Sequence, residues 1–201
     1  TVPGLYAAGE TAAGPHGADR LGGNMQTACQ VFGARAGKAA AARARRRPPQ
    51  QGITARALAQ ILDRVPFAGI GTSPLRGMDE LEARIAEIKR LMWENVLVCR
   101  EEKGLSGTRA AILDCAQHVP NWRELLAKGR TDLIWKVANA ENLLTSAYAT
   151  TLAALTREES RGAHYRIDFP THAETTYFVD VTMEEGQIIA KRVPVENSLG
   201  K

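Results

Sequence analysis

The sequence lacks any long hydrophobic run. No stretch approaches the ~18 consecutive apolar residues that a membrane-spanning helix needs, so we predict no spanning segment. Aromatic residues make up only 5% of the 201 residues, and the core is therefore expected to rest on Leu, Ile, Val and Ala. The first residues also lack the charged, apolar and small-residue pattern of a signal peptide, and we predict none.

Cysteine is scarce, with three residues at positions 29, 99 and 115. Their odd number and wide spacing are not those of a disulfide framework, and they show no metal-ligand spacing. Cys29 is predicted to be a small buried residue of the first helix and not a nucleophile, because nothing near it in the sequence supplies a base. The cysteine content therefore favours a reducing compartment and predicts no metal site.

Charge is unevenly distributed along a chain whose composition, 44% hydrophobic and 24% charged, is that of an ordinary globular protein. The net charge is +4, and its excess lies in the first 50 residues, largely in Arg43, Arg45, Arg46 and Arg47. Such a cluster could contact nucleic acid, but cations also complement the dipole at a helix C-terminus. No aromatic residues are interleaved for base stacking, so we favour the helix end and expect no nucleic-acid partner.

Hydrophobic periodicity predicts a mainly α-helical chain. Val2–Ala8 is predicted to be a short buried strand, and a glycine-rich loop then leads to Asn24, the expected N-cap of the first helix. Helices are predicted over residues 25–47, 56–65, 79–99, 106–118 and 131–159, with another opening at 121–124. Two β-branched runs, 175–182 and 187–195, flank Glu185-Gly186 and predict a β-hairpin.

The most informative stretch is Gly9-Glu10 followed by HGADRLGGN, residues 16–24. A strand, a glycine-rich loop and a capped helix create a helix N-terminus that can meet an anion. Arg20 offers a planar fork that matches a carboxylate, and Glu10 can accept hydrogen bonds from hydroxyl groups. The spacing is neither that of a P-loop nor GxGxxG. From the residues alone, a salt bridge between Arg20 and Asp19 or Glu10 is the favoured alternative.

Two segments of the sequence resemble two motifs of one family, and they occur in the same order as in that family. GLYAAGE, HGADRLGGN and VFGARAG are similar to the segment that closes the FAD domain of succinate dehydrogenase and fumarate reductase flavoprotein subunits. ESRGAHYRIDFP, Glu159–Pro170, is similar to the ESRGAHxRxDxP signature of the same subunits. L-aspartate oxidase is a sister family with a related ending, but RGAHYR looks more like the succinate and fumarate branch. The resemblance fades after about Pro170.

The resemblance implies a domain organisation. Residues 1–48 would be the C-terminal piece of an FAD-binding α/β domain, made of a strand, a glycine-rich loop and a helix. Residues 49–78 would be a linker with a short helix, and residues 79–160 a helical bundle. Residues 161–201 would hold the signature loop and a small β-hairpin tail.

The resemblance also implies hydride transfer between FAD and a C4 dicarboxylate such as succinate or fumarate. Arg20 matches the arginine that binds a substrate carboxylate, and Glu10 matches a residue that contacts FAD. Met25 and Gln26 match the two positions over the flavin, where the family commonly has Ser-Leu. Asp19 replaces the usual Asn and places a negative charge beside Arg20. No catalytic residue and no metal ligand are assigned in this chain.

By the same resemblance, the chain carries only part of a site. The expected partners are an N-terminal FAD-binding half, the dicarboxylate substrate and an iron-sulfur electron-transfer subunit. FAD is expected in the complete protein and not in this chain alone. We expect a cytoplasmic location, or a peripheral one on the cytoplasmic face of a membrane through partner subunits. The alternatives are a non-catalytic helical module that docks a partner, and an L-aspartate oxidase-like enzyme.

Three residues of the second motif, Arg161, His164 and Arg166, look catalytic when taken in isolation. Clusters of polar side chains at domain seams commonly lock an interface. We therefore predict an interdomain role for these three residues.

Overall fold

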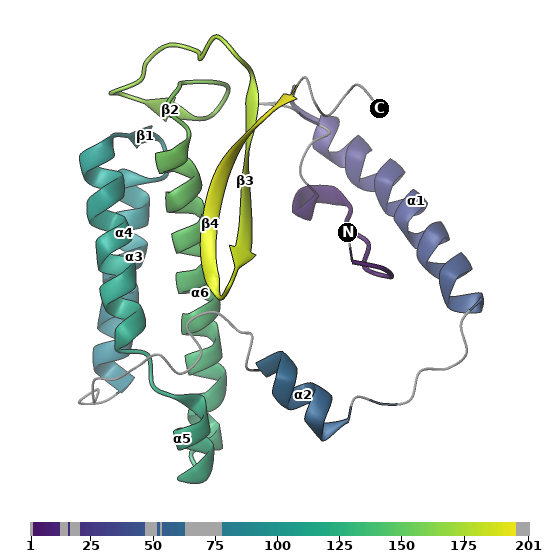
Figure 1. Cartoon of the computed structure of the whole chain (residues 1–201), viewed down its shortest axis with the longest axis vertical. Helices are drawn as coiled ribbons and strands as arrows, with labels where there is room; N and C mark the ends of the chain where they lie inside the picture. The colour runs from purple at the N-terminus through teal and green to yellow at the C-terminus, as the bar shows by residue number, and fades with distance from the viewer. Residues whose placement is uncertain are drawn as a thin grey trace. The chain divides into compact units, whose positions relative to one another are not determined.

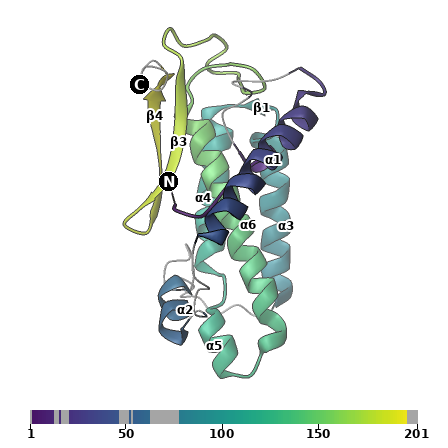
Figure 2. The same cartoon turned by 90° about the vertical axis from the view of Figure 1, so that its right-hand side faces the viewer.

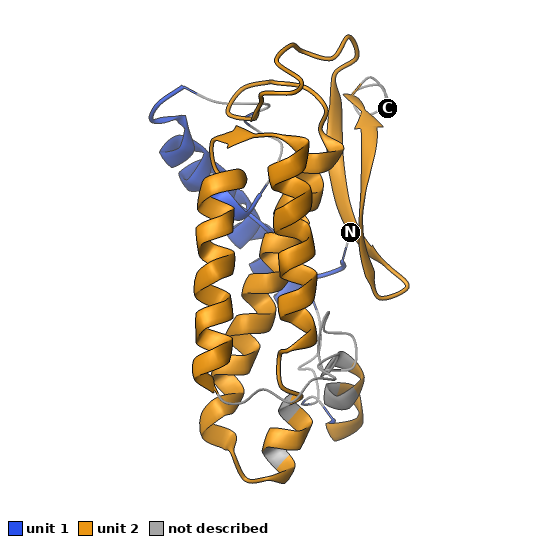
Figure 3. Ribbon diagram, turned by 90° about the vertical axis from the view of Figure 1, so that its left-hand side faces the viewer, with its two compact units in different colours: residues 1–54 blue, residues 55–201 orange. Residues whose placement is uncertain are grey.

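The computed structural model describes residues 2–12, 16, 21–46, 52, 54–62 and 78–195. The chain divides into two compact units, residues 1–54 and 55–201, which Figure 3 colours separately. The described residues form six α-helices, one 3-10 helix and two two-stranded sheets. The predicted predominance of helix is therefore confirmed. None of the described helices is both long enough and apolar enough to cross a membrane.

The first unit is built on one long helix, α1 (Asn24–Arg45), preceded by the 3-10 helix η1 (Gly9–Thr11). The strand predicted over Val2–Ala8 does not form, and most of its residues are exposed. A strand is held by a ladder of hydrogen bonds to a neighbour, and the described residues supply no such neighbour here. The prediction of a strand before the glycine-rich loop is therefore wrong, whereas the helix after the loop is present.

The start of α1 also differs from the prediction by one residue. Gly23, with a φ of 84°, is the N-cap, and Asn24 is already the first helical residue. Glycine reaches this left-handed conformation without the steric cost that a Cβ atom brings. The helix then ends at Arg45, in the basic cluster, with Arg43 and Arg45 in its last turn. Those cations complement the helix dipole, as the sequence indicates.

The second unit is a helical bundle. Its helices are α2 (Ala55–Leu62), α3 (Met78–Asn95), α4 (Glu102–Gln117), α5 (Trp122–Ala127) and α6 (Thr131–Thr156). The long helices α3, α4 and α6 lie side by side, as Figures 1 and 2 show from two directions. Every predicted helix is present, although α3 ends four residues earlier and α4 begins four residues earlier than predicted. The chain between them is extended instead of helical.

The bundle core is made of aliphatic side chains at helical spacing. Leu81 and Ile88 of α3, Ile112 of α4, and Val137 and Leu144 of α6 are each at most 2% exposed. Residues seven apart lie on the same face of a helix, so each helix presents one apolar stripe to the others. Full burial of such a side chain is worth about 1.5–3 kcal/mol, which makes this shared core the main support of the second unit.

Two small sheets complete the second unit. Strand β1 (Cys99–Arg100) pairs in parallel with β2 (Tyr165–Arg166), and β3 (Tyr177–Glu184) pairs antiparallel with β4 (Gln187–Pro194). The predicted hairpin is confirmed, and Glu185 and Gly186 both have positive φ, as a two-residue turn of this kind requires. The hairpin packs along α6.

The core also contains one carboxyl group, that of Glu141 on α6, which is only 4% exposed. Its Oε1 atom has no hydrogen-bond partner among the described residues, and burial raises its pKa to about 7. A carboxyl with a raised pKa is compatible with the fold while it is protonated and destabilises it when ionised. Its cost is therefore absent below the unfolded pKa near 4.5, grows as the pH rises from there to about 7, and stays constant above that pH.

We expect Glu141→Gln to remove this pH dependence. Between pH 5 and pH 9 the wild-type chain should lose about 1–3 kcal/mol more unfolding free energy than the variant, because only the wild type must ionise a buried group. Urea unfolding followed by circular dichroism at several pH values measures the difference. Parallel curves for the two proteins would show that Glu141 is solvated in the folded state.

Candidate functional site

The N-terminal segment lies against α1 and runs in the opposite direction. The Tyr6 hydroxyl donates to the Ala39 carbonyl at 3.4 Å, near the C-terminal half of the helix. Further along the segment, Gly9 packs on Cys29, where an added Cβ would lie 3.1 Å from the Sγ atom. An added Cβ would crowd this Sγ atom, and the φ of 78° at Gly9 would strain any residue that has a side chain. The contact brings Glu10 next to the first turns of α1.

The first turn of α1 is suited to an anionic group. It contains no acidic residue, and its backbone N–H groups give this end of the helix a partial positive charge. Added Cβ atoms at Gly22 and Gly23 would meet nothing within 4 Å among the described residues. Met25 is half-buried and Gln26 is exposed, with the Gln26 N–H donating to the Gly23 carbonyl at 3.1 Å.

The structure therefore brings three of the four predicted site residues to one end of α1. Glu10 in η1 is exposed, and η1 packs against the helix that carries Met25 and Gln26. Arg20 and its neighbour Asp19 lie outside the described residues. Their predicted roles remain predictions.

The second motif forms a network of ion pairs within the second unit. The Glu159 carboxylate is fully buried and accepts hydrogen bonds from Arg157, from Arg161 Nε at 2.9 Å and from the Ala173 N–H at 3.0 Å. Burial raises the pKa of Glu159, but the Ala173 N–H and the two arginines outweigh it and hold the pKa below its ordinary value. Glu159 is therefore ionised at neutral pH.

Arg166 is the other buried centre of this network, with no exposed surface. Its Nε and Nη2 atoms each lie 2.7 Å from an oxygen of Asp168, a bidentate pair. Its Nη1 donates to the Ala154 carbonyl at 2.9 Å, near the C-terminal end of α6, and Nη2 reaches Glu102 of α4 at 3.4 Å. Arg166 lowers the pKa of Asp168 to about 2, so the pair persists across the neutral range.

These contacts give the three polar residues of the motif a structural role inside the second unit. Arg166 holds the loop to the end of α6, Arg161 joins Glu159 to the Ala173 carbonyl, and His164 Nε2 lies 3.1 Å from the Arg157 carbonyl. Burial, and then the charge of Arg100, lower the pKa of His164 to about 4, so its ring is neutral at pH 7. Sequence reasoning selected this motif but missed Glu102, because no local pattern relates α4 to a loop 64 residues away.

Residues 85–197, more than half of the chain, match the family described as "Fumarate reductase flavoprotein C-term". Residues 1–25 match the family described as "FAD binding domain". The chain belongs to the succinate dehydrogenase and fumarate reductase flavoprotein family. The first match covers most of the bundle, from within α3 onward, together with the signature loop and the hairpin. The second covers η1 and the beginning of α1.

Individual members of the flavoprotein family agree with this assignment. The chain is 34% identical to the fumarate reductase flavoprotein subunit of Mycobacterium tuberculosis, over 85% of this chain and 30% of that protein. It is also 34% identical to L-aspartate oxidase of Bacillus subtilis, over 88% and 28%. The Mycobacterium smegmatis Sdh1 complex in the apo form has a similar chain, with a TM-score of 0.69 and 26% identity, over 96% of this chain and 33% of that one. This chain thus spans about a third of the length of these relatives.

Proposed function

We propose that this chain forms the C-terminal part of an FAD-dependent oxidoreductase that interconverts succinate and fumarate, or a related dicarboxylate. One observation carries the proposal. The segment that carries Glu10 packs on α1 through Gly9 and Cys29, and both Glu10 and the start of this helix lie within the residues that match an FAD-binding domain. An acceptor for hydroxyl groups next to a partially positive helix end suits a cofactor that carries both ribityl hydroxyls and phosphates.

The residues present fit FAD, and each has a distinct role in the proposal. Glu10 would accept hydrogen bonds from cofactor hydroxyls, and the backbone at Met25 and Gln26 would help to hold the flavin. The positive end of α1 stabilises negative charge in this place. FAD, when bound, supplies the acceptor for a hydride. Arg20 holds one carboxylate of the substrate through its two parallel N–H groups and so fixes the reacting carbon.

The second candidate is an L-aspartate oxidase-like activity, which is favoured by the equally high identity to the Bacillus subtilis enzyme. Aspartate is also a C4 dicarboxylate, so an arginine clamp suits both substrates. The proposal includes two partners. The first is an N-terminal FAD-binding region, because this chain spans about a third of the length of its relatives. The second is an iron-sulfur subunit, because the similar Mycobacterium smegmatis chain belongs to a complex. A cytoplasmic or peripheral location belongs to the same proposal.

Steady-state assays of the complete flavoprotein distinguish the two candidates. We expect fumarate to be reduced with a low-potential dye as donor, and succinate to be oxidised with a dye as acceptor. We expect no turnover with L-aspartate under the same conditions. Turnover with L-aspartate alone would replace the proposed reaction by the second candidate.

We also predict that the 201-residue chain by itself does not bind FAD with sub-micromolar affinity. None of the residues of η1 and α1, all of which the structure describes, is buried. A cofactor of this size needs a pocket that covers most of its surface, and one exposed helix with a short preceding segment cannot provide it. Calorimetry with added FAD, and the quenching of flavin fluorescence, test this prediction. A dissociation constant below the micromolar range would contradict it.

A further inference from the structure

A cavity of about 480 Å³ lies in the second unit between the C-terminal half of α6, the β1–β2 region and strand β3. Arg100, Arg157 and His164 supply its cationic and imidazole groups, and Val179 and Val181 of β3 form an apolar wall. We call this space the arginine cavity. Among the described residues, no Asp or Glu lines it. A cationic surface attracts an anion, and an apolar wall beside it makes this attraction stronger than it is in bulk water.

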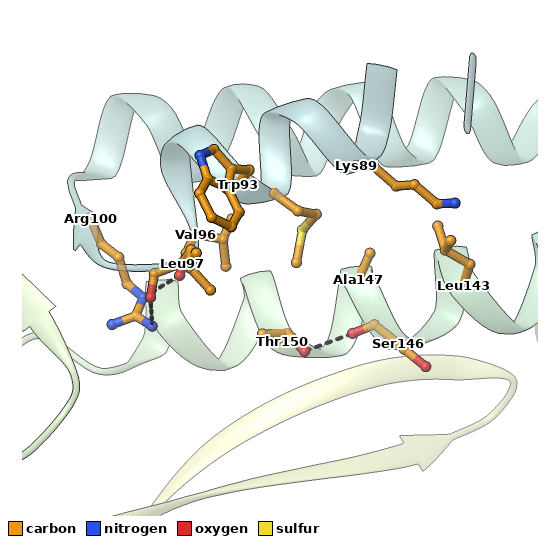
Figure 4. A pocket seen from close by; sticks show the side chains of 10 residues that line it. Lys89, Trp93, Val96, Leu97, Arg100, Leu143, Ser146, Ala147 and Thr150 are labelled. Atoms are coloured by element: carbon orange, nitrogen blue, oxygen red, sulfur yellow. Dashed lines mark hydrogen bonds between the residues drawn. The ribbon is translucent and has the colours of Figure 1, made fainter. Parts of the chain in front are cut away.

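Arg100 is the main source of this positive charge. Its guanidinium donates to three backbone carbonyls: Nε to Val96 at 2.7 Å, Nη2 to Leu97 at 3.0 Å and Nη1 to Ala163 at 3.4 Å. In the described part of the chain no carboxylate pairs with it. Figure 4 shows the side chain at one end of the groove between α3 and α6, where it points from the end of α3 toward α6. A guanidinium has five N–H donors, so donors remain for a ligand.

Neither Arg157 nor His164 neutralises the positive charge of Arg100. Arg157 shares the single Glu159 carboxylate with Arg161, so one negative charge serves two guanidinium groups. His164 is half-buried, and its low pKa reflects both burial and the positive charges of Arg100 and Arg157. Arg166 adds no uncompensated positive charge, because both Asp168 and Glu102 pair with it. The cavity therefore combines space, free donors and unneutralised charge.

We propose that the arginine cavity binds a small oxyanion, a carboxylate or a phosphate, with Arg100 as its principal ligand. The anion neutralises Arg100 and lies against the Val179 and Val181 wall. Its charge also favours the protonated form of His164, so binding is coupled to proton uptake. All of these residues belong to the second unit, and the proposal does not rest on the proposed flavin chemistry.

The proton coupling gives a direct test on the 201-residue chain. The pKa of His164 is measured by NMR of its ring protons, assigned with His164→Gln, while inorganic phosphate or acetate is added. We expect saturating anion to raise this pKa by at least about one unit, because an opposite charge within a few ångströms favours the charged form. Sodium chloride at matched ionic strength is the control. An equal rise with chloride would mean general screening and would overturn the proposal.

Two variants and a matched control test whether Arg100 is the group that binds the anion. Arg100→Gln should abolish the anion-dependent shift, whereas Arg90→Gln should retain it. The control removes the same charge from an exposed part of α3, where Arg90 pairs with Glu87 and Glu94. Because Arg100→Gln also removes bonds to the end of α3, a second variant keeps Arg100 in place. Thr150→Glu puts a carboxylate on the exposed cavity-facing position of α6, and it should block added anion and raise the melting temperature.

The two anions distinguish the source of the ligand. A shift with phosphate alone identifies a tetrahedral oxyanion, and a shift with acetate alone identifies a carboxylate; either result supports the site. If neither anion moves the His164 pKa, the proposal is overturned. An unchanged anion response in Thr150→Glu would also overturn it, even if Arg100→Gln fails to fold.

Discussion

Replacement of Arg166 by Met is expected to lower the unfolding free energy of the second unit by roughly 3–5 kcal/mol, the range seen when one partner of a buried ion pair is removed. The variant would leave Asp168 without its bidentate partner and the Ala154 carbonyl without its donor. It would also break the link from the signature loop to Glu102 on α4. Methionine fills part of the volume but satisfies none of these polar groups.

Chemical denaturation of the wild type and the variant measures this loss. Arg90→Met is the matched control, because Arg90 pairs with two carboxylates on an exposed helix face. Exposed ion pairs are worth about 0–1 kcal/mol, so the control should unfold close to the wild type. If Arg166→Met were no less stable than Arg90→Met, the buried network would not hold the signature loop to the bundle.

In the complete flavoprotein, Arg20→Lys is expected to lower turnover by at least ~10²-fold while the FAD content stays unchanged. Lysine keeps the positive charge but loses the two parallel N–H donors that hold a carboxylate in one orientation. Hydride transfer needs the reacting carbon within about 3–3.5 Å of the flavin, so a substrate that is bound but misplaced reacts slowly. Steady-state kinetics with flavin absorbance read on the same sample provide both quantities.

The outcomes of this substitution separate three roles for Arg20. A fall in turnover with full flavin content supports contact with the substrate. Near-normal turnover would make Arg20 a loop residue that pairs with Asp19 or Glu10, the alternative that the sequence leaves open. Loss of flavin would instead assign Arg20 to the cofactor.

The sequence predicts the bundle and the hairpin well because their signals are local. Leu81 and Ile88 recur at helical spacing on α3, and the turn at Glu185-Gly186 separates two β-branched runs. Each signal lies within one element, so it can be found without knowledge of the partner element. The motif ESRGAHYRIDFP is also visible in the sequence, although the bonds of Arg166 cannot be derived from it.

Features that depend on distant partners are not predictable in this way. The strand expected at Val2–Ala8 has suitable residues, but it has no hydrogen-bonded neighbour among the described residues. The parallel pair β1–β2 joins two-residue segments 66 positions apart, which are too short to show a period. The approach of Gly9 to Cys29 likewise follows from tertiary packing, and it is this approach that sets Glu10 beside α1.

The most direct test of the proposed function is a single turnover of the complete flavoprotein. The protein is reduced anaerobically, mixed with fumarate, and followed by flavin absorbance in a stopped-flow instrument. We predict that fumarate reoxidises the flavin in one rapid phase, and that the rate of this phase falls at least ~10²-fold in Arg20→Lys. A flavin that stays reduced in the presence of saturating fumarate would contradict the proposal that this chain completes a dicarboxylate site.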